Sequence, residues 1–83
     1  MDEPLLLRVL RERHPRAEAL AILAVEELPG GATRVEAEWA DTCEYVRRDF
    51  VFSPSPEGEV VGPGGARWTI SEGGTRRSKP PLT

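Results

Sequence analysis

Asparagine and glutamine are absent from the 83-residue sequence, and a single lysine stands against ten arginines. Side-chain amides are chemically labile at high temperature, and thermophilic proteins contain fewer of them. Their absence indicates a thermophilic source, and the excess of arginine is also typical of a GC-rich genome.

Cysteine and histidine occur once each, as Cys43 and His14. This excludes an intramolecular disulfide, a cysteine-rich zinc site and most other metal geometries. The two residues are also the only pair able to act as nucleophile and base, yet the pattern places one at a helix end and the other in a hairpin loop. We therefore expect no catalytic residue, no metal and no cofactor.

Long apolar runs are missing too. No stretch approaches the ~20 apolar residues of a membrane span, and the first four residues carry acids where a signal peptide carries positive charge. We expect a cytoplasmic protein without a membrane span. The length, the 39% of hydrophobic residues and the net charge of −3 allow one small acidic domain.

The N-terminal pattern predicts a helix from Pro4 to Arg13. Asp2 stands where a helix cap is expected, Pro4 suits a first turn, and apolar residues follow at helical spacing. Pro15 disfavours helical geometry at His14, which makes His14 the C-terminal residue of this helix.

The segment from Ala17 to Leu28 allows two interpretations. Its alanines, leucines and glutamates are good helix formers, which would give a helical hairpin on a small sheet. However, its apolar residues fill both faces evenly, as in a central strand, and Pro29-Gly30-Gly31 follows as a hairpin turn. We predict a strand.

Two further strands alternate strictly and determine a register. Residues 33–39 and 46–52 each place apolar side chains on one face, and pairing residues whose numbers sum to 83 brings these faces together. This register closes a four-residue loop, 40–43. It predicts the opposed pairs Ala37 with Val46, Thr33 with Phe50, Glu36 with Arg47, and Arg34 with Asp49, so the second face carries a salt-bridged lattice.

The remaining chain is rich in turn residues. The Ser-Pro-Ser-Pro stretch, 53–56, predicts a loop, a short strand follows at 59–61, and the segment 67–70 alternates once more. None of the Gly-rich stretches precedes a helix pattern, so they predict turns rather than a phosphate loop. Residues 71–83 lack apolar residues except Leu82, and we expect a flexible basic tail after a domain of residues 1–70.

These elements predict an α+β fold with one N-terminal helix packed on a three- to four-stranded antiparallel meander. One helix covers less apolar surface of the sheet than the sequence predicts. We expect the excess to form an interface, with a homodimer or another protein as partner. The residues expected in this interface are Leu5, Leu7, Leu23, Val25, Tyr45 and Val51.

Two other functions compete with this non-enzymatic interaction module. Arg76, Arg77 and Lys79 in the tail indicate a docking segment or a nucleic-acid adaptor, although three charges on an acidic protein are few for nucleic acid. A small cavity-forming enzyme would use Glu36, Glu38 and Tyr45, but 83 residues leave little room for a pocket.

The order of motifs resembles the PepSY domain over about residues 4–61. The matching segments are His14-Pro15-Arg16-Ala17, Val25-Glu26-Glu27, Val35-Glu36-Ala37-Glu38 and Gly58-Glu59-Val60-Val61. This resemblance implies a small module that modulates or inhibits a protease or accompanies a membrane protein, usually outside the cytoplasm. The chain departs from it at Arg47-Arg48 and at the Ser-Pro-Ser-Pro loop, and it lacks an export signal. Cystatin-like domains share the same arrangement of a helix on a meander.

Overall fold

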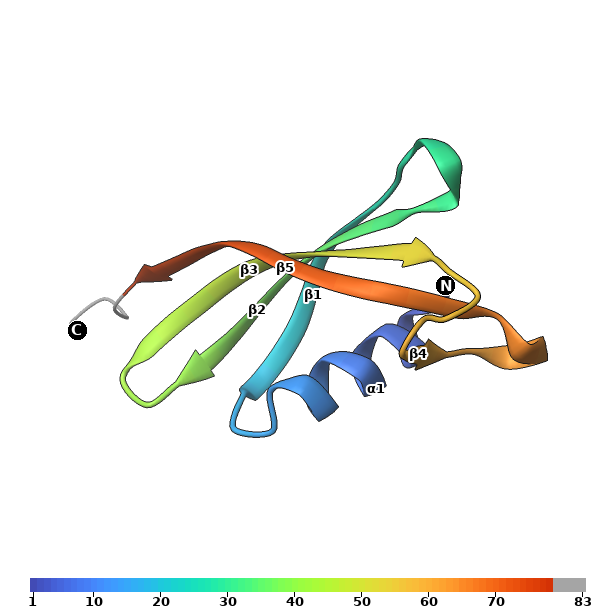
Figure 1. The fold of residues 1–83 in the computed structure, drawn as a ribbon. Helices are drawn as coiled ribbons and strands as arrows, with labels where there is room; N and C mark the ends of the chain where they lie inside the picture. The colour runs from blue at the N-terminus through green and yellow to red at the C-terminus, as the bar shows by residue number, and fades with distance from the viewer. Residues whose placement is uncertain (79–83) are drawn as a thin grey trace.

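The computed structural model describes residues 1–78 and confirms the α+β class (Figure 1). One helix is followed by five strands, not three to four. The elements are α1 (Glu3–Arg13), β1 (Glu18–Glu27), β2 (Thr33–Asp41), β3 (Glu44–Pro54), β4 (Val60–Val61) and β5 (Arg67–Ser78), with short 3₁₀ turns η1 (Pro29–Gly31) and η2 (Pro63–Gly65).

Helix α1 begins and ends as its sequence predicts. The Asp2 carboxylate accepts a hydrogen bond from the Leu5 amide at 3.1 Å, which satisfies one of the free N–H groups of the first turn. At the other end, His14 is the C-cap and its N–H donates to the Leu10 carbonyl. The buried residues of the helix, Leu5, Leu6, Val9 and Leu10, form the stripe that packs on the sheet.

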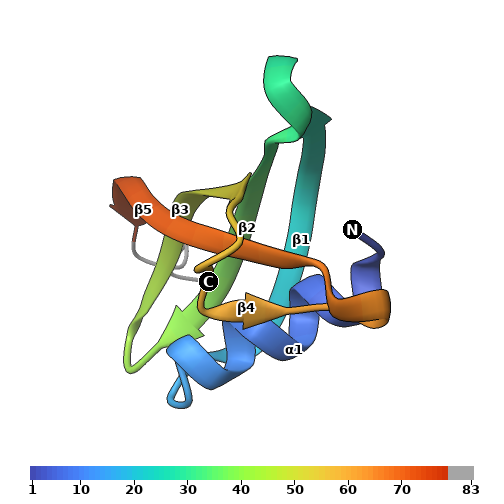
Figure 2. The same cartoon turned by 45° about the vertical axis from the view of Figure 1, so that its right-hand side comes forward.

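The strands form one antiparallel sheet in the order β1-β2-β3-β5-β4. Strand β5 lies between β3 and β4, because the chain leaves β3, forms the short β4 and returns beside β3. The sheet curls around α1, so that β4 lies near the helix (Figures 1 and 2). There the Arg8 guanidinium donates to the Val61 carbonyl at 3.2 Å.

The core lies between α1 and the concave face of the sheet. Alternate residues of β2 and β3 face it, and Val35 lies opposite Phe50 while Trp39 lies opposite Val46. Phe50 and Val35 are fully buried. The predicted faces of these two strands are therefore confirmed.

The predicted register of β2 and β3 is wrong by two residues. Ala37 lies opposite Arg48 rather than Val46, and Thr33 opposite Phe52 rather than Phe50. Because side chains alternate with a period of two, a shift of two leaves every residue on its predicted face. The shift arises from a tighter hairpin. Asp41 pairs with Glu44, and only two residues form the turn, with Thr42 at a positive φ of 59°.

Strand β1 confirms the strand interpretation of residues 17–28, but it lies at the edge of the sheet rather than at the centre. Its pairing with β2 is irregular at two places. Ala19 has a positive φ of 53°, and Leu23 is an extra residue between Ile22 and Ala24. Leu20 and Ile22 pack partly against the core, whereas most of the strand is exposed.

The predicted flexible tail also needs correction. Residues 71–78 continue β5 and pair with β3 as far as Ser78, opposite Tyr45. The long β3 leaves an edge with free hydrogen-bonding groups, and pairing with β5 satisfies them. Gly74, at a positive φ of 66°, lies at the irregularity of this pairing. Lys79 and the residues after it lie outside the described part of the chain.

Candidate functional site

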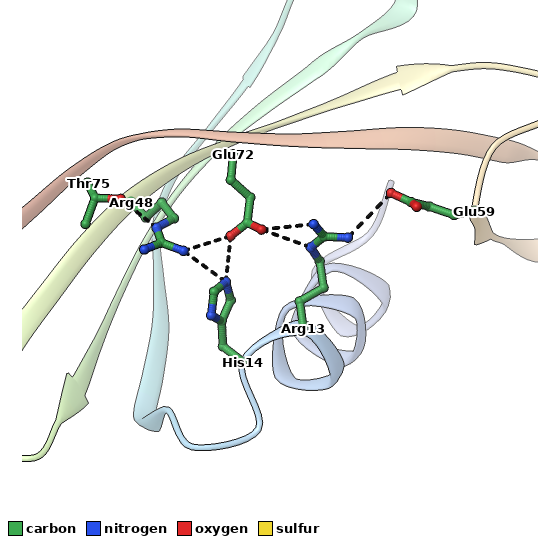
Figure 3. Close-up of polar contacts among 6 residues, drawn as sticks. All are labelled: Arg13, His14, Arg48, Glu59, Glu72 and Thr75. Carbon is green, nitrogen blue, oxygen red and sulfur yellow. Dashed lines mark hydrogen bonds and ion pairs between the residues drawn. The ribbon is translucent and has the colours of Figure 1, made fainter.

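Within residues 1–78, the most concentrated polar contacts meet at Glu72 on β5 (Figure 3). Three cationic or polar side chains reach this carboxylate from two other directions. Arg13 and His14 come from the end of α1, and Arg48 comes from β3. We call Arg13, His14, Arg48 and Glu72 the Glu72 cluster.

Each oxygen of the Glu72 carboxylate has its own donors. Oε2 accepts from the Arg13 guanidinium, at 2.9 Å from Nη2 and 3.3 Å from Nε. Oε1 accepts from Arg48 Nη1 at 3.0 Å and lies 2.6 Å from His14 Nε2. The two arginines extend the cluster, because Arg13 also reaches Glu59 at 3.4 Å and Arg48 donates to the Thr75 hydroxyl at 2.7 Å.

The short distance between His14 and Glu72 shows which ring nitrogen of His14 carries a hydrogen. A carboxylate oxygen only accepts, so His14 Nε2 carries the hydrogen and donates it. The same nitrogen then has no lone pair for Arg48, which lies 3.4 Å away, and that contact is not a hydrogen bond. The imidazole is further held by stacking on Trp39, with ring centroids 4.7 Å apart.

The electrostatics of the cluster keep Glu72 ionised. Partial burial alone would raise the pKa of this carboxyl, but the hydrogen bonds from Arg13, His14 and Arg48 together lower its pKa to about 2. A general acid or base near neutral pH needs a pKa near 7. The Glu72 cluster therefore holds the end of α1 to β5 by charge-assisted hydrogen bonds and is poorly suited to proton transfer.

The convex face of the sheet carries the predicted salt-bridged lattice. Arg34 lies 3.1 Å from Asp49 and 3.5 Å from Glu26. The other partners differ from the predicted pairs because of the two-residue register shift. Arg47 contacts Glu38 at 2.9 Å, and Glu36 instead contacts Arg76 of β5 at 3.0 Å. Both glutamates considered for an enzyme are thus bound to arginine.

The six residues expected to form an interface do not share one surface. The prediction for Leu5 is wrong. Its side chain is only 8% exposed and belongs to the core, because it lies on the face of the helix that packs on the sheet. Leu7 and Val51 are partly buried. Val25 lies opposite Val35 on the concave side, whereas Tyr45 lies opposite Ala40 on the convex side.

Three of these six residues nevertheless expose large apolar or aromatic area. Leu23 is 43% exposed, Val25 49% and Tyr45 42%. Leu23 and Val25 are close in the sequence of edge strand β1, which has β2 on one side and no strand of residues 1–78 on the other. Tyr45 stands apart from them on β3.

The basic residues expected in a docking tail are held by the sheet. Arg76 contacts Glu36, and Arg77 contacts Glu44 at 3.2 Å. Lys79, the third residue of this hypothesis, lies outside the described residues. Cys43 is exposed in the turn between β2 and β3, and the ring contacts of His14 are with Trp39 and Phe50.

The Glu72 cluster was not predicted from the sequence, because Glu72 falls in the segment expected to be a flexible tail. A signal was present: Trp68, Ile70 and Glu72 continue one alternating face. In the structure these three residues lie opposite Pro54, Phe52 and Phe50 along β3. The charged residue Glu72 interrupts the apolar pattern, but the strand continues to Ser78.

No family model, no curated protein and no solved structure matches this chain. The resemblances to PepSY and cystatin-like domains therefore stay predictions. Within residues 1–78, the single helix is too short and too polar to cross a membrane. The same residues contain no group of three metal-ligating side chains.

Proposed function

We propose that the chain is a small, non-enzymatic protein–protein interaction module that associates with a second copy through the exposed edge of β1. The observation that carries this proposal is the exposure of Leu23 and Val25 on an outermost strand. Exposed apolar side chains on an unpaired edge are a common site of association between chains.

The other surfaces offer less to a partner. The convex face is occupied by ion pairs between arginines and carboxylates. The opposite edge consists of β5, whose residues 69–78 contain one large apolar side chain, Ile70, packed against the core, and of β4, which covers only Arg67 and Trp68. Strand β4 has only two residues, and the Val61 carbonyl accepts a hydrogen bond from Arg8. A short strand whose carbonyl is already bonded is protected against further pairing.

The geometry of β1 favours contact through side chains over a continuous ladder. The extra residue Leu23 and the positive φ of Ala19 interrupt regular pairing along the edge. A two-fold arrangement brings Leu23 and Val25 of both copies together, since the same patch then contacts itself.

The expected dimer is weak. Burying the exposed halves of four Leu and Val side chains contributes roughly 4 kcal/mol, which only offsets the smaller estimates of the cost of association. A dimer therefore also needs contacts from the neighbouring residues of the β1 edge. We therefore expect a monomer in dilute solution and a dimer at high protein concentration.

A charge at the centre of the patch tests the proposal. We expect Leu23→Glu to have a lower average mass than the wild-type chain at concentrations where the wild-type chain dimerises, as measured by light scattering. The matched control is Val61→Glu, because Val61 is 44% exposed on the other edge of the sheet. Equal masses for wild type and Leu23→Glu at every concentration would contradict the proposal, as would loss of the dimer in Val61→Glu alone.

A further inference from the structure

A groove of about 620 Å³ lies between the loop after β3 and the turn η2. Its walls are formed by Pro54 and Pro56 on one side and by Ala66, Arg67 and Trp68 on the other. It is distinct from the β1 edge, because β1 and β5 are separated by two strands in the sheet.

The groove is preformed by rigid parts of the chain. The Trp68 ring lies directly over Gly62, where an added Cβ would come within 2.5 Å of the ring. The backbone of Trp68 is equally close to Gly58, at 2.3 Å from the position of such a Cβ. Pro54 and Pro56 have a fixed φ, so the opposite wall loses little conformational entropy when it binds a ligand.

Other grooves of the described residues are already crossed by polar contacts. Between α1 and β4, Arg8 reaches the Val61 carbonyl and Arg13 reaches Glu59. The groove near Ser78 is lined by the charges of Glu38, Arg47, Arg76 and Arg77. The groove between the loop after β3 and η2, here called the Trp68 groove, is lined by Trp68, two prolines and an alanine together with Ser55, Gly65 and Arg67. Its polar contacts lie along its floor and rim, where the Ser55 N–H donates to the Arg67 carbonyl and the Arg67 guanidinium donates to the Gly58 carbonyl.

We propose that the Trp68 groove binds the Lys79-Pro80-Pro81-Leu82 segment of a second copy of this chain. Grooves lined by aromatic side chains recognise extended proline-rich segments, which lose little entropy when they bind. The segment has two consecutive prolines and an apolar residue, and its lysine complements the exposed Glu57 that follows Pro56.

The length of the chain determines that the segment comes from another copy. Ser78 pairs with Tyr45, and Trp68 pairs with Pro54, so the two places lie nine residues apart along β3, about 30 Å. Residues 79–82 span at most about 14 Å when fully extended. The segment therefore falls short of the groove of its own chain.

The two indole N–H signals of the chain provide the test. The full-length Leu23→Glu variant is used, so that association through β1 does not contribute. Its ¹⁵N NMR spectrum is recorded from about 10 µM to about 1 mM, the range expected for a weak interaction. We expect the Trp68 indole signal to shift with concentration, while that of Trp39, which is only 4% exposed, stays constant.

The tail prolines provide the matched variants. In the same Leu23→Glu background, Pro80→Ala combined with Pro81→Ala removes the concentration dependence at Trp68, whereas Thr83→Ala retains it. A Trp68 signal that is constant with concentration overturns this proposal, as does one that shifts equally without the two prolines. Neither result bears on the β1 proposal, which depends on the difference in mass between the wild-type chain and Leu23→Glu.

Discussion

At the scale of single residues, Glu72 connects more parts of the molecule than any predicted site residue. Its carboxylate contacts Arg13 and His14 at the end of α1 and Arg48 on β3, and these partners are far from Glu72 in the sequence. The Glu72 side chain is 23% exposed, so solvent screens these bonds only in part. Removing one partner of such a group leaves the other charges without compensation.

The low pKa of Glu72 predicts a pH dependence of stability. The carboxyl has a pKa of about 2 in the folded chain against an ordinary 4.5, so the unfolded chain binds more protons between these values. The stabilisation is fully present above pH 4.5 and is lost as the pH falls toward 2. After allowance for solvent screening, we expect it to be about 2 kcal/mol at pH 7.

Urea unfolding of the wild type and of Glu72→Gln between pH 7 and pH 2 measures this contribution. The variant is less stable at pH 7, and the difference between the two proteins shrinks as the pH falls. Glu57→Gln is the control, because Glu57 is an exposed loop residue. A constant difference between wild type and Glu72→Gln across the whole range would contradict the assigned ionisation.

At the scale of elements, β5 decides how the sheet closes over the helix. The strand is 12 residues long and carries an irregularity at Gly74 and Thr75, next to the regular pair of Gly73 with Asp49. Gly74 has a positive φ, and a Cβ there would lie 3.0 Å from Asp49 Oδ2. Gly73 has neither a positive φ nor an atom within 4 Å of its Cβ position.

These neighbouring glycines predict opposite outcomes for the same substitution. We expect Gly74→Ala to destabilise the protein by about 1–2 kcal/mol, because a left-handed backbone is unfavourable for an L side chain. Gly73→Ala is expected to be neutral or slightly stabilising, since it reduces the entropy of the unfolded chain. Chemical denaturation of the two variants gives the comparison, and similar losses in both would show that the bulge does not depend on Gly74.

At the scale of the whole molecule, a small core is supplemented by contacts across the curled sheet. The buried core has eleven hydrophobic residues, which is modest for a chain of this length. Binding that is restricted to the folded state adds to stability by mass action. Association of two copies therefore couples directly to the thermal stability of each.

The proposed association predicts that the melting temperature rises with protein concentration. For a domain of this size we expect an increase of about 5 °C once the concentration exceeds the dissociation constant about tenfold. Differential scanning calorimetry over that range is the measurement. The Leu23→Glu variant provides the reference without the β1 contact, and an equally steep rise in that variant would contradict the assignment of the dimer to β1.

The sequence by itself determined the helix and the faces of the two central strands, β2 and β3. Asp2 and Pro15 mark the limits of α1, and the alternation from Thr33 to Trp39 separates buried from charged residues. These features depend on local sterics, capping and a period of two, which neighbouring residues specify without distant contacts.

Only the tertiary structure decided the register, the place of β1 at the edge and the role of Glu72. The register depends on whether Asp41 and Glu44 pair, a choice that the repeating alternation leaves open in steps of two. The position of β1 depends on its pairing with β2, and the strand character of residues 71–78 depends on their pairing with β3. Glu72 meets Arg13, His14 and Arg48 only because the sheet curls around the helix, and no local pattern contains that curvature.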